Sequence, residues 1–181
     1  MNFFKHLKTV LSHRHTVMRG CFRMGLYRQG LFHDLSKLSP TEFLVGVKYF
    51  HGHQSPNNGE RNAIGYSSAW LHHKGRNKHH YEYWIDFSMR YLPGGMAPVP
   101  MPPKYLAEMF ADRVAACKVY DRDNYDDGSA LRYYQSGKDP APMHDDTRRI
   151  LVEWLTLLAD EGEKKTFAHI KKAIKEKSLS K

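Results

Sequence analysis

The sequence predicts an all-α domain organised as a helical bundle. Apolar side chains recur at three- and four-residue spacing through nearly every periodic stretch, whereas the alternating pattern of a half-buried strand is nearly absent. Hydrophobic residues make up 41% of the 181 residues and charged residues 26%, so the chain can bury one core. We therefore expect a single helical domain over residues 1–181, of which residues 163–181 form a basic C-terminal helical extension.

The first helix is expected to begin at a cap on Asn2. Its apolar stripe continues through Cys21, and Gly25 and Gly30 bracket its end. A short helical piece then carries residues 31–37, with the sequence LFHDLSK.

A capping box is expected to start the next helix. Ser39 is the candidate N-cap, Pro40 takes the first helical position, and Glu42 completes the box. This helix is predicted to run to about Phe50. Residues 51–61, HGHQSPNNGER, are expected to form a loop because of their composition.

Two helical segments are expected in the middle of the chain, over residues 63–75 and 79–91, with a break between them. Residues 92–103, LPGGMAPVPMPP, are expected to cross the molecule without regular structure. A strong helix should follow over residues 104–120, because two prolines precede a long periodic stretch.

The C-terminal part is expected to contain two more helices. Residues 123–137 should form a turn and a short helix, and residues 147–167 a long amphipathic helix. From Glu163 onward the chain is helical and basic in pattern, and we expect its end to fray.

The charge balance favours anionic partners. The formal net charge is +9, which suits phosphorylated metabolites, nucleic acid or an anionic surface. We expect no membrane span, because no apolar run approaches 18 residues, and no secretory signal, because the basic start lacks an apolar stretch. Cys21 and Cys117 form no CxxC motif and are expected as reduced core thiols of a cytoplasmic protein, a disulfide between them being the alternative.

Histidine is strongly over-represented. The chain has 12 histidines, and eight of them occur in four pairs: His13 and His15, His51 and His53, His72 and His73, His79 and His80. Clustered imidazoles indicate metal or proton chemistry, although each one taken alone could be an ordinary surface or core residue.

Four residues on three predicted helices are candidates for one site. His13 borders the apolar stripe of the first helix. His33 and Asp34 are adjacent, and helical neighbours point about 100° apart, so they are either a core residue beside a solvated cap or two ligands of one metal. Asp112 lies at the edge of an apolar helix face, where a carboxylate needs a cation: a metal, or an arginine such as Arg23 or Arg113.

The ordered set His13, then His33 with Asp34, then Asp112 resembles the signature of the HD-domain superfamily of metal-dependent phosphohydrolases. The two gaps are 19 and 77 residues, and the resemblance covers about residues 6–120. It implies an HD-domain-like bundle in which these four residues hold a divalent metal. More narrowly, the motifs HDLSK, RNKHHYEYW and EMFADR resemble an uncharacterised family of small microbial and phage proteins, which brings no activity.

A second metal is implied by further histidines. Some HD phosphodiesterases bind a second ion through histidines between the doublet and the last aspartate, and the candidates in this sequence are His73, His79 and His80. Glu82 is then expected to orient His79. The alternative is that these histidines cap a helix or pack against Trp70, Tyr83 and Trp84.

Phosphate contacts are expected from Lys37 and Arg76. Lys37 lies one helical turn after Asp34, and Lys74 and Arg76 add charge near the histidines. A lysine at this place resembles the HD phosphodiesterases of the cyclic-dinucleotide class, but their DGxGYP stretch is absent, which argues against that substrate. The alternative is that all three are solvated surface residues.

These observations predict a metal-dependent phosphohydrolase that cleaves a phosphate mono- or diester, such as a nucleotide, through metal-activated water. Imidazole and carboxylate ligands suit one or two ions of Mn, Fe, Zn, Co or Ni. Asp34 and Lys37 are the expected catalytic residues. Two alternatives stay open: a non-catalytic or oxidative HD-like metal-binding protein, and a basic protein that binds nucleic acid through its C-terminal tail.

Overall fold

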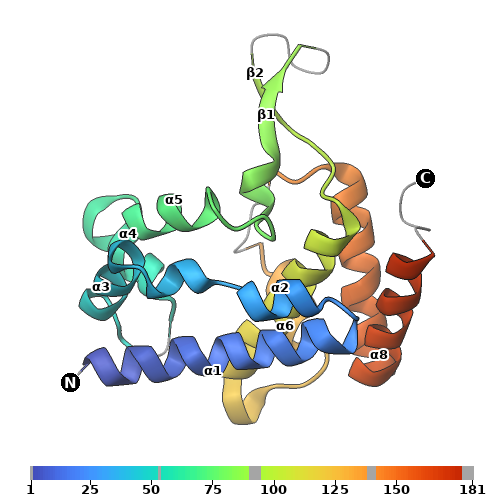
Figure 1. Cartoon of the computed structure of the whole chain (residues 1–181), viewed down its shortest axis with the longest axis horizontal. Coiled ribbons are helices and arrows are strands. Elements are labelled where there is room, and N and C mark those ends of the chain that lie inside the picture. The colour runs from blue at the N-terminus through green and yellow to red at the C-terminus, as the bar shows by residue number, and fades with distance from the viewer. Residues whose placement is uncertain (1, 53, 90–94, 138–141, 177–181) are drawn as a thin grey trace.

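Three long helices form the framework of the chain: α1 (Asn2–Arg23), α6 (Pro103–Asp121) and α8 (Asp145–Lys175) (Figure 1). The structure is a computed structural model that describes residues 2–52, 54–89, 95–137 and 142–176. The predicted all-α class is confirmed. The other described elements are α2 (Tyr27–Phe32), η1 (Leu35–Leu38), α3 (Pro40–Lys48), α4 (Pro56–Ile64), α5 (Ser68–Lys74), η2 (Tyr81–Trp84), β1 (Ile85–Ser88), β2 (Gly95–Pro98), η3 (Arg122–Asn124) and α7 (Ser129–Gln135).

The core lies where α1, α6 and α8 meet. Phe110 of α6 packs edge-to-face against Trp154 and Phe167 of α8, with ring centroids 6.0 and 5.9 Å apart. Burying these aromatic rings supplies a large part of the apolar area that stabilises the bundle. Cys21 and Cys117 are both buried and free, as expected.

Helix α8 bends sharply at Gly162. The φ angle of this residue is 75°, a left-handed value that glycine adopts without strain. After the bend, Phe167 and Ile170 are buried in the core, so the basic segment from Glu163 to Lys175 packs onto the domain. The expected fraying of the chain end falls on residues 177–181, which lie outside the described residues.

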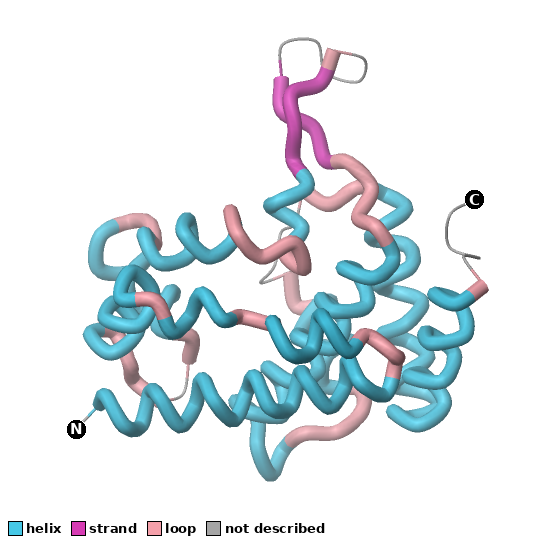
Figure 2. Tube along the Cα trace, in the orientation of Figure 1, coloured by secondary structure: helices cyan, strands magenta, loops and turns pink. Residues whose placement is uncertain are grey.

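A second helical group, α3 to α5, packs beside the N-terminal half of α1, at the left of Figure 1. A two-stranded antiparallel hairpin stands away from the helices, with Phe87 opposite Met96 in its register (Figure 2). In this way α1, α2, α5 and α6 surround one polar region, which contains the candidate site.

Three local predictions were wrong. Residues 79–91 were expected to be helical. Instead, residues 81–84 form a 3₁₀ turn and residues 85–88 form a strand. Residues 95–98, expected as irregular, supply the partner strand. Residues 56–61, expected as part of a loop, belong to α4, because Pro56 takes the first helical position after the extended residue Ser55.

Candidate metal centre

The adjacent residues His33 and Asp34 lie at a break in the helical chain. Helix α2 ends at Phe32, His33 begins a turn with φ −51° and ψ 127°, and Asp34 has φ 51° and ψ 29°, in the left-handed region. The expectation of one helical piece over residues 31–37 was therefore wrong at its centre. Because of this turn the two neighbouring side chains converge, and His33 Nε2 lies 3.3 Å from Asp34 Oδ2. Aspartate is one of the few non-glycine residues that tolerate this conformation.

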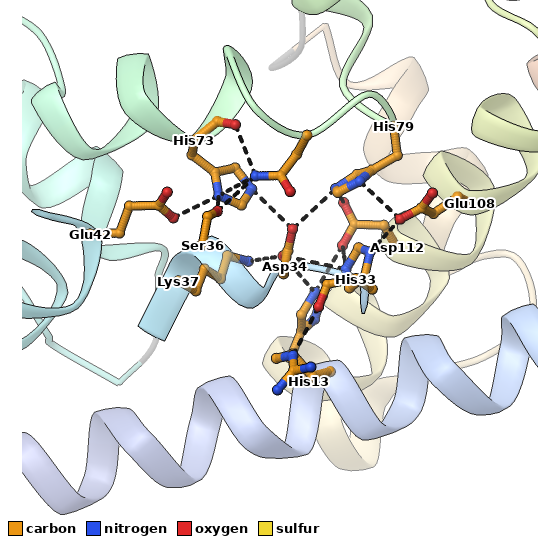
Figure 3. Close-up of polar contacts among 12 residues, drawn as sticks. His13, His33, Asp34, Ser36, Lys37, Glu42, His73, His79, Glu108 and Asp112 are labelled. Carbon is orange, nitrogen blue, oxygen red and sulfur yellow. Dashed lines mark hydrogen bonds and ion pairs between the residues drawn. The ribbon is translucent and has the colours of Figure 1, made fainter. Parts of the chain in front are cut away.

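The four residues singled out by the sequence come together around Asp34 (Figure 3). His13 Nε2, on α1, lies 2.8 Å from Asp112 Oδ1, on α6, and 3.9 Å from Asp34 Oδ2. His33 Nε2 lies 3.6 Å from the same oxygen of Asp112. One ligand atom from each residue lies within 4.8 Å of the others, which is close enough for one ion to contact all four.

A second group shares Asp34 with the first. The Oδ1 atom of Asp34 lies 3.2 Å from His73 Nε2 and 3.2 Å from His79 Nε2. His80 adds a fourth donor, and these ligand atoms again lie within 4.8 Å of one another. His73 and His80 also pack against Trp70, as the alternative interpretation expected. The same two histidines therefore pack on an aromatic ring and face Asp34.

Two buried glutamates hold the other side of the imidazole rings. Glu108 Oε1, on α6, lies 3.0 Å from His33 Nδ1 and 3.1 Å from His79 Nδ1. Glu42 Oε2, on α3, lies 2.7 Å from His73 Nδ1. A carboxylate that accepts the Nδ1 proton leaves the Nε2 lone pair facing the centre, which is the usual arrangement behind metal-bound histidines.

The sequence pattern suggested the wrong role for Glu42 and did not indicate any role for Glu108. Glu42 was expected to complete a capping box, but Ser39 makes no capping hydrogen bond and Glu42 instead contacts His72 and His73, each at 2.7 Å. Glu108 was not recognised, and it makes the contact to His79 that was expected of Glu82.

Most of the candidate ligand atoms are buried and make no hydrogen bond. Among the described residues, the buried side-chain atoms that make no hydrogen bond include Nε2 of five histidines and both carboxylate oxygens of Asp34. The five histidines are His13, His33, His73, His79 and His80. Unsatisfied buried polar atoms are costly, and here they all face one another. The donor set therefore fits divalent metal ions, which would satisfy these atoms together.

The electrostatics of the centre favour bound cations. Burial raises the pKa of Asp34, but His33 and Lys37 outweigh it and hold the pKa well below its usual range. Burial lowers the pKa of His33, but Asp34 and Asp112 outweigh it and raise the pKa well above normal. In His13 burial prevails and lowers the pKa, which leaves the ring neutral and able to bind a metal.

Lys37 belongs to the centre, whereas Arg76 lies at its periphery. Lys37 Nζ lies 2.6 Å from Asp34 Oδ2, and its side chain is 30% exposed. Arg76 is exposed and donates to the carbonyl oxygen of His72 at 3.2 Å. Arg23, considered as a partner for Asp112, instead forms an ion pair with Glu163 at 2.6 Å.

The fold and the centre define a helical protein with a buried cluster of histidines and carboxylates of the kind that holds divalent metals. The chain belongs to a family of unknown function, DUF5662, whose sequence model matches residues 2–157 and so includes every candidate ligand. No curated protein and no solved structure matches the chain. The relation to the HD-domain superfamily stays a prediction. Within the described part of the chain, every helix is too short or too polar to cross a membrane.

Proposed function

We propose that this protein is a metal-dependent phosphohydrolase in which two divalent ions share Asp34. One observation carries the proposal: five buried histidine nitrogens that make no hydrogen bond converge around the two buried oxygens of that carboxylate. His13, His33 and Asp112 would complete one ion site, and His73, His79 and His80 the other. A shared carboxylate is a natural bridge, because each of its two oxygens already faces a different group of ligands.

The donor set suits Mn, Fe, Zn, Co or Ni, since imidazole nitrogen and carboxylate oxygen are borderline ligands. Such ions supply a nucleophile by lowering the pKa of coordinated water, and they neutralise the oxygens of a phosphoryl group. Asp34, whose pKa is held well below its usual range, stays ionised and can therefore serve as an anionic ligand.

Lys37 is the residue best placed to bind a phosphoryl oxygen. Burial lowers its pKa, but Asp34 and Asp112 outweigh this effect and raise it, so the ammonium group stays charged at neutral pH. The side chains of Lys37 and Asp112 are 30% and 17% exposed, whereas that of Asp34 is fully buried, so the centre opens to solvent on the side of these two residues. An anionic substrate arriving there would meet the ammonium group first.

The test combines metal analysis with hydrolysis of two chromogenic esters. Purified protein is analysed for bound metals, stripped with a chelator, and assayed with p-nitrophenyl phosphate and bis(p-nitrophenyl) phosphate after addition of each candidate metal. We expect metal-dependent release of nitrophenol from at least one ester. His13→Ala should abolish it, whereas His15→Ala, at an exposed position on the same helix, should not.

Two results would contradict the proposal. The first is a protein that binds none of these metals and cleaves neither ester. The second is iron with an oxygen-dependent absorption band and no hydrolysis, which would favour the oxidative alternative.

A further inference from the structure

A basic groove runs along α1, the helix that also carries His13 of the candidate metal centre. It has a volume of about 740 Å³ and lies between the N-terminal half of α1, residues 50–52 and the C-terminal end of α6 with the residue that follows it. Its cationic lining comes from Lys5, Lys8, Lys118 and Arg122, and none of the described residues that line it carries a carboxylate. A volume of this size is typical of a ligand site and not of a packing defect.

Most of this charge is not compensated. Lys118 forms an ion pair with Glu163, but among the described residues no carboxylate lies within ion-pair distance of Lys5, Lys8 or Arg122. Both lysines are exposed. The groove therefore presents at least three free cationic groups, an arrangement that attracts a ligand with more than one negative charge.

The shape of the groove favours an extended ligand. Lys5, Thr9, Ser12 and Thr16 all line it and follow one face of α1 at three- and four-residue spacing. At 1.5 Å per residue this stripe is about 16 Å long, which exceeds the length of a single phosphate group several-fold. Phe50 and His51 also line the groove and add two aromatic rings, a side-chain type on which bases can stack.

The groove and the metal centre are built on the same two helices. Helix α1 carries His13 directly after the groove residue Ser12, and α6 carries Asp112 before Lys118. His13 Nε2 and Asp112 Oδ1, 2.8 Å apart, join these helices at the centre. We propose that the groove binds the phosphodiester backbone of single-stranded nucleic acid and presents it to the metal centre. This inference rests on the proposed phosphohydrolase function and names its substrate class.

The test measures binding without metal. A fluorescein-labelled oligothymidylate of about 12 nucleotides is titrated with the full chain in excess chelator, and anisotropy is followed from about 50 to 200 mM salt. The variant is Lys5→Glu with Lys8→Glu. The matched control is Lys172→Glu with Lys175→Glu, which changes the net charge equally on α8, at the opposite end of the molecule (Figure 1).

We expect the groove variant to bind the oligonucleotide at least about tenfold more weakly. The slope of log binding constant against log salt concentration should fall in magnitude by about 1.4, because each of the two lost phosphate contacts contributes about 0.7 to it. The α8 variant should stay within about twofold of the unmodified chain. Thermal unfolding confirms that both variants are folded, and Lys5→Arg with Lys8→Arg should restore binding, because it restores the charge.

Three outcomes would overturn the inference: equal losses in both charge-reversed variants, unchanged binding in the groove variant, or competition by ATP as effective as by the oligonucleotide at equal phosphate concentration. Metal loading and hydrolysis of the small esters are measured on the same variants. If these persist while oligonucleotide binding fails the test, the substrate assignment is wrong and the phosphohydrolase proposal stands. If the oligonucleotide binds as expected but the protein holds no metal, the phosphohydrolase proposal is wrong and the groove remains a nucleic-acid-binding site.

Discussion

Arg14 Nε, on α1, donates a hydrogen bond of 2.9 Å to the carbonyl oxygen of His33. Its Nη2 atom also donates to the carbonyl oxygen of Leu31 at 3.3 Å. These two carbonyls lie at the end of α2, where the left-handed turn at Asp34 ends the helical hydrogen bonding. One arginine therefore fixes the backbone turn that makes His33 and Asp34 converge.

Replacing Arg14 by methionine should weaken metal binding more than it weakens folding. Without the two hydrogen bonds, the turn at Asp34 can relax, and the geometry of two neighbouring ligands is lost. We expect a loss of about tenfold or more in metal affinity, measured by competition with a chromophoric chelator. Arg19→Met, at an exposed position on α1, is the control. Equal affinities in both variants would show that Arg14 does not position the ligands.

Replacing Glu108 by glutamine should weaken both metal sites, whereas replacing Glu42 should weaken only one. Glu108 contacts His33, a ligand of the first site, and also His79, a ligand of the second. Glu42 contacts His73, which belongs to the second site alone. Glutamine is uncharged and no longer favours the Nδ1 proton, and such losses cost about 10- to 100-fold in affinity.

Calorimetric titration of the metal-free protein resolves this difference. We expect two binding steps in the unmodified chain, both weakened in Glu108→Gln and only one weakened in Glu42→Gln. Glu153→Gln, an exposed substitution on α8, controls for the loss of a negative charge. A total stoichiometry of one ion per chain in the unmodified protein would rule out two separate sites.

The long helices and the four residues that converge at the centre could be predicted from the sequence. Periodic apolar spacing determines which face of α1 is buried, and it placed His13 at the edge of that face, where the structure has it. Asp112 was recognised because an ionisable side chain beside a buried helix face requires a partner. Both inferences depend on the spacing of apolar side chains along one helix, which can be seen in a single sequence.

The supporting glutamates and the turn at Asp34 depend on contacts that local patterns do not contain. Glu42 follows a serine and a proline and so has the pattern of a cap, although its partners lie 30 and 31 residues further along the chain. Glu108 had one usable signal: it precedes Asp112 by one helical turn and therefore shares its face. The left-handed conformation of Asp34 is stabilised by Arg14 from another helix, so no local rule could give it.

Replacing Gly46 by alanine should destabilise the fold even though alanine favours helices. Gly46 is buried in α3, and a Cβ atom there would clash with His6 Nε2. The His6 ring also packs against Phe43 and Phe50, which limits how far it can move. We expect a net loss of about 1–3 kcal/mol in the free energy of unfolding, measured by urea denaturation. Combining Gly46→Ala with His6→Ala should recover part of the loss, and simple additivity would contradict this contact.

His6 should make the metal-free protein less stable in mild acid. Burial, together with the nearby charge of Lys37, lowers the pKa of His6 from 6.5 to about 4. The unfolded chain then binds a proton between these two values that the folded chain does not. The stabilisation is complete above pH 6.5 and declines as the pH falls toward 4, with a slope of up to about 1.4 kcal/mol per pH unit. Urea denaturation of the unmodified chain and of His6→Leu, in chelator at several pH values, measures this contribution. The leucine variant should show a shallower decline over this range, and parallel curves would mean that His6 has the same pKa in both states.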